Sequence, residues 1–315
     1  LERCYHSGVN TPSLAAKTLS WHVLGAGAIG GLWALRLASR GIPVTLIAHG
    51  DDAGERTLRI DNAEELPAQV FLQRPATDPG VVEALLVTTK SQLTADALKP
   101  LLPHLPQGIP VLLLQNGMGA ETFLRWQRPD LCLLTGISTD GVWRRERDHL
   151  VLAGRGETVI GADQAAHADI AQAIAAELHD PRWPVQAVDD IQRRRWLKLA
   201  MNCAINPLTA IHRCRNGELL QKPEALTTMQ AVCDEVAAVM TAEGMASDGA
   251  TLFQAACAAA EKTAANISSM HADVAAGRET EIDFINGHVL ARAAAHGIDA
   301  PTNTALLERI RALPH

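Results

Sequence analysis

Short apolar runs alternate with segments of helical periodicity in the first half of the chain. Runs typical of buried strands occupy residues 21–24, 44–48, 85–89 and 111–114. Between them, apolar side chains recur at helical spacing, first from Leu32 to Leu37 and later over 93–105. This β-α-β alternation predicts a parallel sheet packed with helices.

The remaining pattern divides the chain into two parts. We expect short strands within 57–74 and strands at 131–139, 150–153 and 157–161, the last two as a hairpin, followed by a helix over 165–178. A proline-containing break at 180–184 follows, and from about Asp189 the pattern is helical throughout. The sequence therefore predicts an α/β domain over 20–187 and an all-α domain over 188–315. Residues 1–19 form an extension that we leave out of the fold prediction.

A glycine-rich turn joins the first predicted strand to the first predicted helix. Gly25, Gly27 and Gly30 have the G-x-G-x-x-G spacing of a dinucleotide-binding turn, and the intervening residues are Ala26, Ala28 and Ile29. In such a turn the glycines admit a tight bend, a close approach of backbone amides to a pyrophosphate, and close packing of helix on strand. A glycine-rich turn with no ligand would show the same spacing. The flanking strand and helix favour dinucleotide binding.

The end of the second predicted strand bears on which dinucleotide binds. An acidic residue at this point is typical of NAD enzymes, because it accepts a hydrogen bond from the ribose 2′-hydroxyl. This chain has His49 there, with Arg56 nearby, while Asp51 and Asp52 follow a glycine. The pattern favours NADP, without excluding that the two carboxylates reach the ribose.

Polar residues follow the carboxyl ends of the predicted parallel strands. Lys90 follows the strand at 85–89, and Asn116 follows the strand at 111–114. Because the carboxyl ends of parallel strands line one crevice, we expect Lys90 and Asn116 to lie near the glycine turn and His49. Taken singly, Lys90 could be a loop lysine and Asn116 part of a turn.

A polar stripe follows one face of an otherwise apolar helix over 196–208. Lys198, Asn202 and Asn206 are spaced by four residues and therefore lie in one narrow arc. An unsatisfied buried polar group costs about 1–3 kcal/mol, so these side chains need partners or water. We expect the stripe to face a cleft. The alternative is a lysine that extends to solvent and asparagines that cap neighbouring loops.

A further helix is predicted to begin near residue 280. Thr280 is the expected N-cap and Asp283 its capping-box partner, which would place Glu281 in the first turn, where the helix dipole favours an ionised carboxylate. A glutamate at a helix start is also ordinary end electrostatics.

Composition excludes several classes of protein. With 47% hydrophobic and 20% charged residues among 315, the chain suits a globular protein with two cores. A net charge of -7 argues against nucleic-acid and membrane-surface partners, and no apolar run is long enough to span a membrane. The six cysteines lack zinc-site spacing and predict buried thiols, no metal and a cytoplasmic protein.

Six stretches resemble, in order and spacing, the ketopantoate reductases (2-dehydropantoate 2-reductases). They cover 25–30, 89–92, 115–119, 198–209, 268–270 and 280–283, within a likeness over about 20–310. The resemblance implies a Rossmann-type dinucleotide-binding domain followed by an all-α domain, the 6-phosphogluconate-dehydrogenase-like plan. It also implies NADPH-dependent reduction of 2-dehydropantoate, a 2-oxo acid, to pantoate on the way to pantothenate and coenzyme A.

The resemblance also implies roles for single residues. Carried over, Lys198 is the general acid, while the substrate is held by Asn202, Asn206, Ser269 and Glu281. The glycines hold the pyrophosphate, and Lys90 and Asn116 border the nicotinamide and substrate. The family often has an arginine for the 2′-phosphate where this chain has His49.

Two other functions remain compatible with the sequence. A related 2-oxo acid or hydroxyacid dehydrogenase could keep the lysine and use a different substrate. A non-catalytic NADP-binding sensor would bind cofactor without turnover, which the buried Lys198 stripe and Glu281 argue against. The oligomeric state stays open, a homodimer included.

Overall fold

The computed structural model describes residues 18–48, 50 and 52–313, which form two compact units. Residues 1–17 of the expected extension, and His49, lie outside the described residues. The first unit combines the chain up to Thr88 with Pro100–Leu113 and Arg128–Asp189. The second unit combines Thr89–Lys99 and Leu114–Gln127 with Asp190–His315. The segments that carry Lys90 and Asn116 therefore group with the helical part of the chain.

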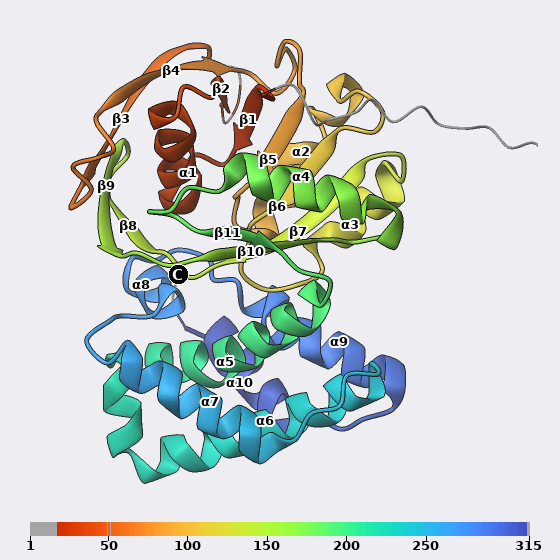
Figure 1. The fold of residues 1–315 in the computed structure, drawn as a ribbon. Helices are drawn as coiled ribbons and strands as arrows, with labels where there is room; N and C mark the ends of the chain where they lie inside the picture. The colour runs from red at the N-terminus through yellow and green to blue at the C-terminus, as the bar shows by residue number, and fades with distance from the viewer. Residues whose placement is uncertain (1–17, 49, 51, 314–315) are drawn as a thin grey trace, which may run out of the picture. The chain divides into compact units, whose positions relative to one another are not determined.

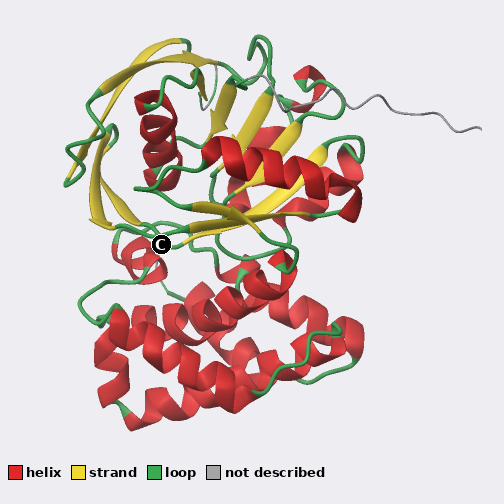
Figure 2. Cartoon of the chain, viewed as in Figure 1, coloured by secondary structure: helices red, strands yellow, loops and turns green. Residues whose placement is uncertain are grey.

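The first unit is built on one mixed sheet (Figures 1 and 2). Within the described residues the strand order is β11-β10-β7-β6-β5-β1-β2-β4-β3-β9-β8. The strands are β1 (Trp21–Leu24), β2 (Val44–Ile47), β3 (Gly54–Asp61), β4 (Gln69–Arg74), β5 (Ala84–Val87), β6 (Pro110–Leu113), β7 (Cys132–Ser138), β8 (Gly141–Glu146), β9 (His149–Gly154), β10 (Thr158–Ala162) and β11 (Val185–Ala187). Strands β2, β1, β5, β6 and β7 pair in parallel, and β1, β5 and β6 are buried throughout.

Helix α1 (Ala28–Ser39) begins at the glycine turn after β1 and lies inside the curve of the sheet (Figure 1). It contacts β1 and β2 on one side and β3, β8 and β9 on the other. Its residues 30–37 are therefore all buried, which explains why the segment is apolar nearly all round. The predicted α/β fold with a dinucleotide-binding type of β-α-β start is confirmed.

Two predictions for the first half of the chain are wrong, a hairpin and an unbroken helix. The strands expected at 150–153 and 157–161 do not form a hairpin: β9 pairs with β8 and β3, whereas β10 pairs with β7 and β11. The missed partner, β8, is a polar and largely exposed edge strand, so it lacks the apolar alternation that marks a strand.

The helix expected over 93–105 is broken. It consists of η2 (Ser91–Leu93), α2 (Thr94–Leu98) and η3 (Leu102–His104). Pro100 and Pro103 have no amide hydrogen to donate within a helix, so the periodic leucines cannot continue as one element. In the same unit as β10, η4 (Ala165–His167) and α4 (Ala168–Leu178) occupy the helix predicted over 165–178.

The second unit is helical and is organised around α5 (Ile191–His212). Helix α5 contacts α6, α7, α8 and α10, and its apolar side chains lie in one core cluster with theirs. Besides η2 and α2, the other elements are α3 (Ala120–Gln127), η5 (Asn216–Gln221), α6 (Pro223–Ala242), α7 (Gly249–Lys262), α8 (Ser269–Ala275), η6 (Ile282–Phe284), α9 (Asn286–His296) and α10 (Pro301–Arg311). The predicted all-α second part is confirmed.

The cysteines and the helix lengths bear on two expectations from composition. Cys132, Cys203, Cys214 and Cys233 are buried free thiols, and Cys257 is partly buried. Cys4 lies outside the described residues. No helix in the described part of the chain is both long and apolar enough to cross a membrane.

Candidate active site

The glycine turn has the geometry of a pyrophosphate cradle. Gly25 has a φ of 95°, a conformation that favours glycine, and its carbonyl accepts a hydrogen bond from the Gly27 amide at 2.6 Å. A Cβ at Gly30 would lie 2.3 Å from Thr88 Oγ1 and 2.4 Å from the Gly25 carbonyl oxygen, so no larger residue fits. The N-cap of α1 is Gly27, which has no side chain to bond to the first amides of the helix, and the first turn holds no acidic residue. The amides at this helix start are thus available to an anion.

Arg56 on β3 lies beside this turn. Its Nη2 donates to the carbonyl oxygen of Ala26 at 3.3 Å, and its Nε donates to Asp148 Oδ1 at 2.6 Å. The side chain is 14% exposed. Ala28 and Ile29 form the first turn of α1. The first unit therefore holds a fixed guanidinium next to the glycine turn. It belongs to Arg56, the arginine that the sequence analysis noted near the end of the second predicted strand.

Glu281 is the centre of a polar cluster in the second unit. The residue is 8% exposed, and its Oε1 accepts a hydrogen bond from the Ser91 amide at 3.0 Å. Its Oε2 accepts from Asn116 Nδ2 at 3.5 Å, while Ser91 Oγ donates to the Asn116 carbonyl oxygen at 2.6 Å. Residues that follow two predicted strands thus meet a carboxylate 190 and 165 positions further along the chain.

Burial controls the ionisation of Glu281. Removal from water raises the pKa of the carboxyl group, and the Ser91 amide, the charge of Lys90 and the Asn116 amide oppose this rise. The expectation that a helix dipole keeps Glu281 ionised is wrong, because no α-helix begins there.

The predicted N-cap and capping box at this position are wrong for the same reason. Glu281 precedes η6, a three-residue 3-10 helix, and α9 starts only at Asn286. Thr280 Oγ1 accepts from the Ile282 amide at a long 3.4 Å, and Asp283 pairs instead with Arg311 on α10.

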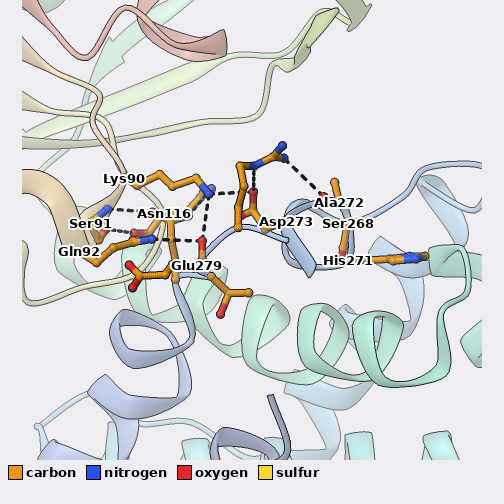
Figure 3. A network of polar contacts seen from close by, with 12 residues as sticks. Lys90, Ser91, Gln92, Asn116, Ser268, His271, Ala272, Asp273 and Glu279 are labelled. Carbon is orange, nitrogen blue, oxygen red and sulfur yellow. Dashed lines mark hydrogen bonds and ion pairs between the residues drawn. The ribbon is translucent and has the colours of Figure 1, made fainter. Parts of the chain in front are cut away.

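Lys90 is held by a second carboxylate of the helical unit (Figure 3). Its Nζ lies 2.7 Å from Asp273 Oδ1 and donates to the Glu279 carbonyl oxygen at 3.1 Å. Asp273 is 6% exposed and also accepts from Arg278 Nε at 3.0 Å. The ammonium of Lys90 is thus held in place by two contacts, one with Asp273 and one with the backbone of Glu279. Neither Ser91 nor Asp273 was among the predicted site residues, because no local spacing marks a contact across so many residues.

The predicted polar stripe lies on α5. Lys198 and Asn202 are half-buried and Asn206 is buried, among neighbours such as Leu199 and Cys203 that are buried completely. Burial lowers the pKa of the Lys198 ammonium, and the charge of Glu281 opposes this change. Lys198 and Glu281 are therefore electrostatic neighbours, an amine and a carboxyl group that both lie in a partly dehydrated place.

Ser269 is less involved in the described contacts than the sequence predicts. It is the exposed first residue of α8. Its neighbour Ser268 is the buried N-cap, which accepts from the His271 amide at 3.1 Å and shares a 2.6 Å hydrogen bond with Thr209 Oγ1 on α5. The role of Ser269 stays a prediction. No group of three or more His, Cys, Asp or Glu side chains in the described parts of the chain could hold a metal ion.

Comparison with known proteins gives a consistent result over both units. The family model described as "Ketopantoate reductase PanE/ApbA" matches residues 21–164, and its C-terminal counterpart matches 190–314. A 2-dehydropantoate 2-reductase of Vibrio cholerae is 39% identical over 295 residues, which is 92% of this chain and 96% of the relative. The corresponding protein of Archaeoglobus fulgidus is 34% identical over 292 residues, with the same shares covered.

Solved structures support the fold. A PanE/ApbA family ketopantoate reductase from Ralstonia eutropha has a TM-score of 0.82 and 29% identity, and the match covers 94% of this chain and 98% of that one. A D-mandelate dehydrogenase with NADH has a TM-score of 0.83 at 21% identity, covering 93% and 97%. At that identity the second likeness speaks for the fold alone.

Proposed function

Because the chain belongs to the ketopantoate reductase family, we propose that it reduces 2-dehydropantoate to pantoate with NADPH. As a member of this family it is an oxidoreductase that uses a nicotinamide dinucleotide and a small-molecule substrate. The observation that carries the proposal is that a buried carboxyl group, Glu281, lies close enough to the partly buried amine of Lys198 to influence its pKa.

The glycine turn fits the cofactor. When bound, the dinucleotide supplies a hydride to the carbonyl carbon of the substrate. The amides at the start of α1 would bind the pyrophosphate, since Gly27 places no side chain there and Gly30 lets the helix pack closely on the turn. Arg56, fixed next to Ala26, would attract the 2′-phosphate that distinguishes NADP from NAD. His49 would add charge only below its unperturbed pKa of about 6.5, so the preference for NADPH should shrink as pH rises from about 6 to 8.

Lys198 would provide the proton. Hydride transfer to a 2-oxo carbon builds negative charge on the carbonyl oxygen, which must then be protonated by a donor within about 3 Å. An ammonium whose pKa is lowered by burial gives up its proton more readily than an exposed lysine. Reduction requires the protonated form, so kcat/KM for reduction should fall as pH rises through the pKa of Lys198.

The remaining polar groups of the second unit would bind the substrate. Asn202 and Asn206 on α5 offer amides to a carboxylate or hydroxyl group, and Ser269 offers a hydroxyl group. Glu281, when ionised, accepts a hydrogen bond from a substrate hydroxyl. Lys90 and Asn116 would border the nicotinamide and substrate, and both already contact carboxylates of this unit.

A substrate panel tests the proposal. The purified protein is assayed for NADPH and NADH oxidation with 2-dehydropantoate and with simpler 2-oxo acids that lack its hydroxyl and methyl groups. The proposal predicts the highest kcat/KM with 2-dehydropantoate and NADPH. A higher kcat/KM with a simpler acid would favour a related dehydrogenase, and cofactor binding without oxidation would favour a sensor. A lower Kd for NADH than for NADPH at pH 7 would refute the cofactor assignment.

A further inference from the structure

We propose that the buried ion pair between Glu121 and Arg195 positions Asn116 for substrate binding, a role that rests on the proposed function. Glu121 lies on α3 and Arg195 on α5, and Arg195 Nη1 donates to Glu121 Oε1 at 2.9 Å. Glu121 is 5% exposed and Arg195 is 9% exposed. Both belong to the second unit, as do Asn116, Glu281 and Lys198.

The carboxyl group of Glu121 stays ionised at neutral pH. Burial tends to raise the pKa of Glu121, but the charge and hydrogen bond of Arg195 outweigh it and lower that pKa to about 2. The neighbouring His288 does not compete for the carboxylate, because burial lowers its pKa to about 4 and leaves the imidazole neutral. The other charges that face His288 are Arg292 and Glu243, which oppose each other.

The second oxygen of Glu121 holds the loop that carries Asn116. Glu121 Oε2 accepts from the Gly119 amide at 2.9 Å, and Gly119 has a φ of 105°. Earlier in the loop, the Met118 amide donates to the Phe284 carbonyl oxygen at 2.8 Å. The segment 116–119 is therefore held at its far end by Glu121 and by the Phe284 carbonyl, and at Asn116 by Ser91 and Glu281.

Arg195 connects this loop to the helix of the proposed acid. It lies three residues before Lys198 on α5, so the two side chains leave neighbouring faces of the same helix one turn apart. The carboxylate of Glu121 thus joins the Asn116 loop to α5, and Asn116 in turn contacts Glu281. Through these contacts the ion pair ties the loop to α5, while Ser91 and Glu281 hold Asn116 itself.

Stability alone does not explain such a pair. Removing two charges from water offsets most of their attraction, so well-packed apolar residues of similar size often stabilise a protein equally well. What apolar residues cannot do is accept the Gly119 hydrogen bond and fix one orientation at the same time. The directional contacts of Glu121 therefore point to a positioning role, which predicts an effect on catalysis beyond any effect on folding.

A mutant cycle tests this role. Three variants are compared with the parent: Asn116→Ala, the charge-free Glu121→Leu with Arg195→Met, which also removes the acceptor for the Gly119 amide, and all three substitutions together. Removing both charges avoids leaving one buried charge unpaired, which would be strongly destabilising. If the pair acts through Asn116, the first two variants each lose about tenfold in kcat/KM, mainly through KM, and the combined variant loses at most about twofold more. The Kd for NADPH should stay within about twofold of the parent.

Additive effects would overturn the inference. A combined variant that loses the product of the two separate effects shows that the pair and Asn116 act independently, and an unchanged kcat/KM after charge removal shows no positioning role. The matched control is Glu243→Leu with Arg292→Met, another Glu–Arg contact of the helical unit, whose effect should multiply with that of Asn116→Ala. If the charge-free variant does not fold, Glu121→Asp replaces it in the same cycle.

The choice of substrate keeps this test separate from the proposed function. The cycle is measured with whichever 2-oxo acid the parent protein reduces fastest. A parent that does not reduce 2-dehydropantoate contradicts the proposed function, whereas additivity on the substrate it does reduce contradicts only the role of Glu121 and Arg195.

Discussion

Asn286 supports the helix that carries the proposed acid, and its removal should cost less when Pro207 is also replaced. Pro207 lies inside α5 and has no amide hydrogen for the Cys203 carbonyl four residues earlier. Asn286 Nδ2 donates to that carbonyl oxygen at 3.4 Å and also to Asn303 Oδ1 at 2.9 Å. Asn286, Asn303 and Cys203 are all completely buried.

The expected loss can be worked out from these contacts. In Asn286→Ala two buried acceptors lose a donor, while Asn286 Oδ1, which has no partner among the described residues, is removed as well. With about 1–3 kcal/mol for each unsatisfied group, the net loss in free energy of unfolding is about 1–3 kcal/mol. In the Pro207→Ala background the amide of residue 207 can bond to the Cys203 carbonyl, so Asn286→Ala leaves only the Asn303 acceptor without a donor. Removal of Asn286 Oδ1, which has no partner in the described part of the chain, offsets that loss, so the free energy of unfolding should change by close to zero apart from a small cavity.

Urea unfolding followed by circular dichroism measures both differences. Asn286→Ala should lower the midpoint clearly in the parent and much less in the Pro207→Ala background, with similar slopes throughout. Equal losses in the two backgrounds would refute the reasoning, because they would show that Asn286 does not serve the carbonyl left free by the proline. Activity of Pro207→Ala then reports whether the course of α5 matters for the polar stripe.

Three further predictions concern single residues of the two units. Glu281→Gln should lower the pKa of Lys198, because the carboxylate charge raises it, so the basic limb of kcat/KM should move to lower pH, whereas the exposed Glu279→Gln should leave it in place. Arg56→Ala should weaken NADPH binding by about 10- to 100-fold and NADH binding little, since one charge-assisted hydrogen bond is worth about 1.5–3 kcal/mol; equal losses would place Arg56 outside the 2′-phosphate contact. Gly30→Ala should reduce the affinity for both dinucleotides, since its Cβ would overlap Thr88 Oγ1 and the Gly25 carbonyl, and unchanged Kd values would remove the turn from the cofactor contact.

Local chemistry made the first unit largely predictable. The spacing of the glycines within residues 25–30 marks the turn from β1 to α1, and the parallel strands follow from short apolar runs. The strand β8 escaped prediction because an exposed edge strand carries no apolar alternation. The wrong hairpin followed from that omission, since β9 pairs with the strand that the pattern did not reveal.

The polar cluster was predictable in its members more than in its contacts. The spacing of Lys198, Asn202 and Asn206 places them on one face of α5 because a helix is periodic. The partners of Glu281 lie 165 and 190 positions away, and no rule of local spacing connects them. The dipole argument for Glu281 failed because no α-helix begins there, and burial, which the local sequence does not reveal, raises the pKa of its carboxyl group.

The most direct test of the account is the pH dependence of reduction by Lys198→Ala. With 2-dehydropantoate and saturating NADPH, loss of a positioned acid should reduce kcat by about 10²–10⁴-fold and remove the basic limb of the profile, with NADPH affinity retained. Lys262→Ala, which changes an exposed lysine at the end of α7, is the matched control and should behave as the parent does. A folded Lys198→Ala protein that turns over within about threefold of the parent, with its basic limb intact, would show that the proton comes from another group.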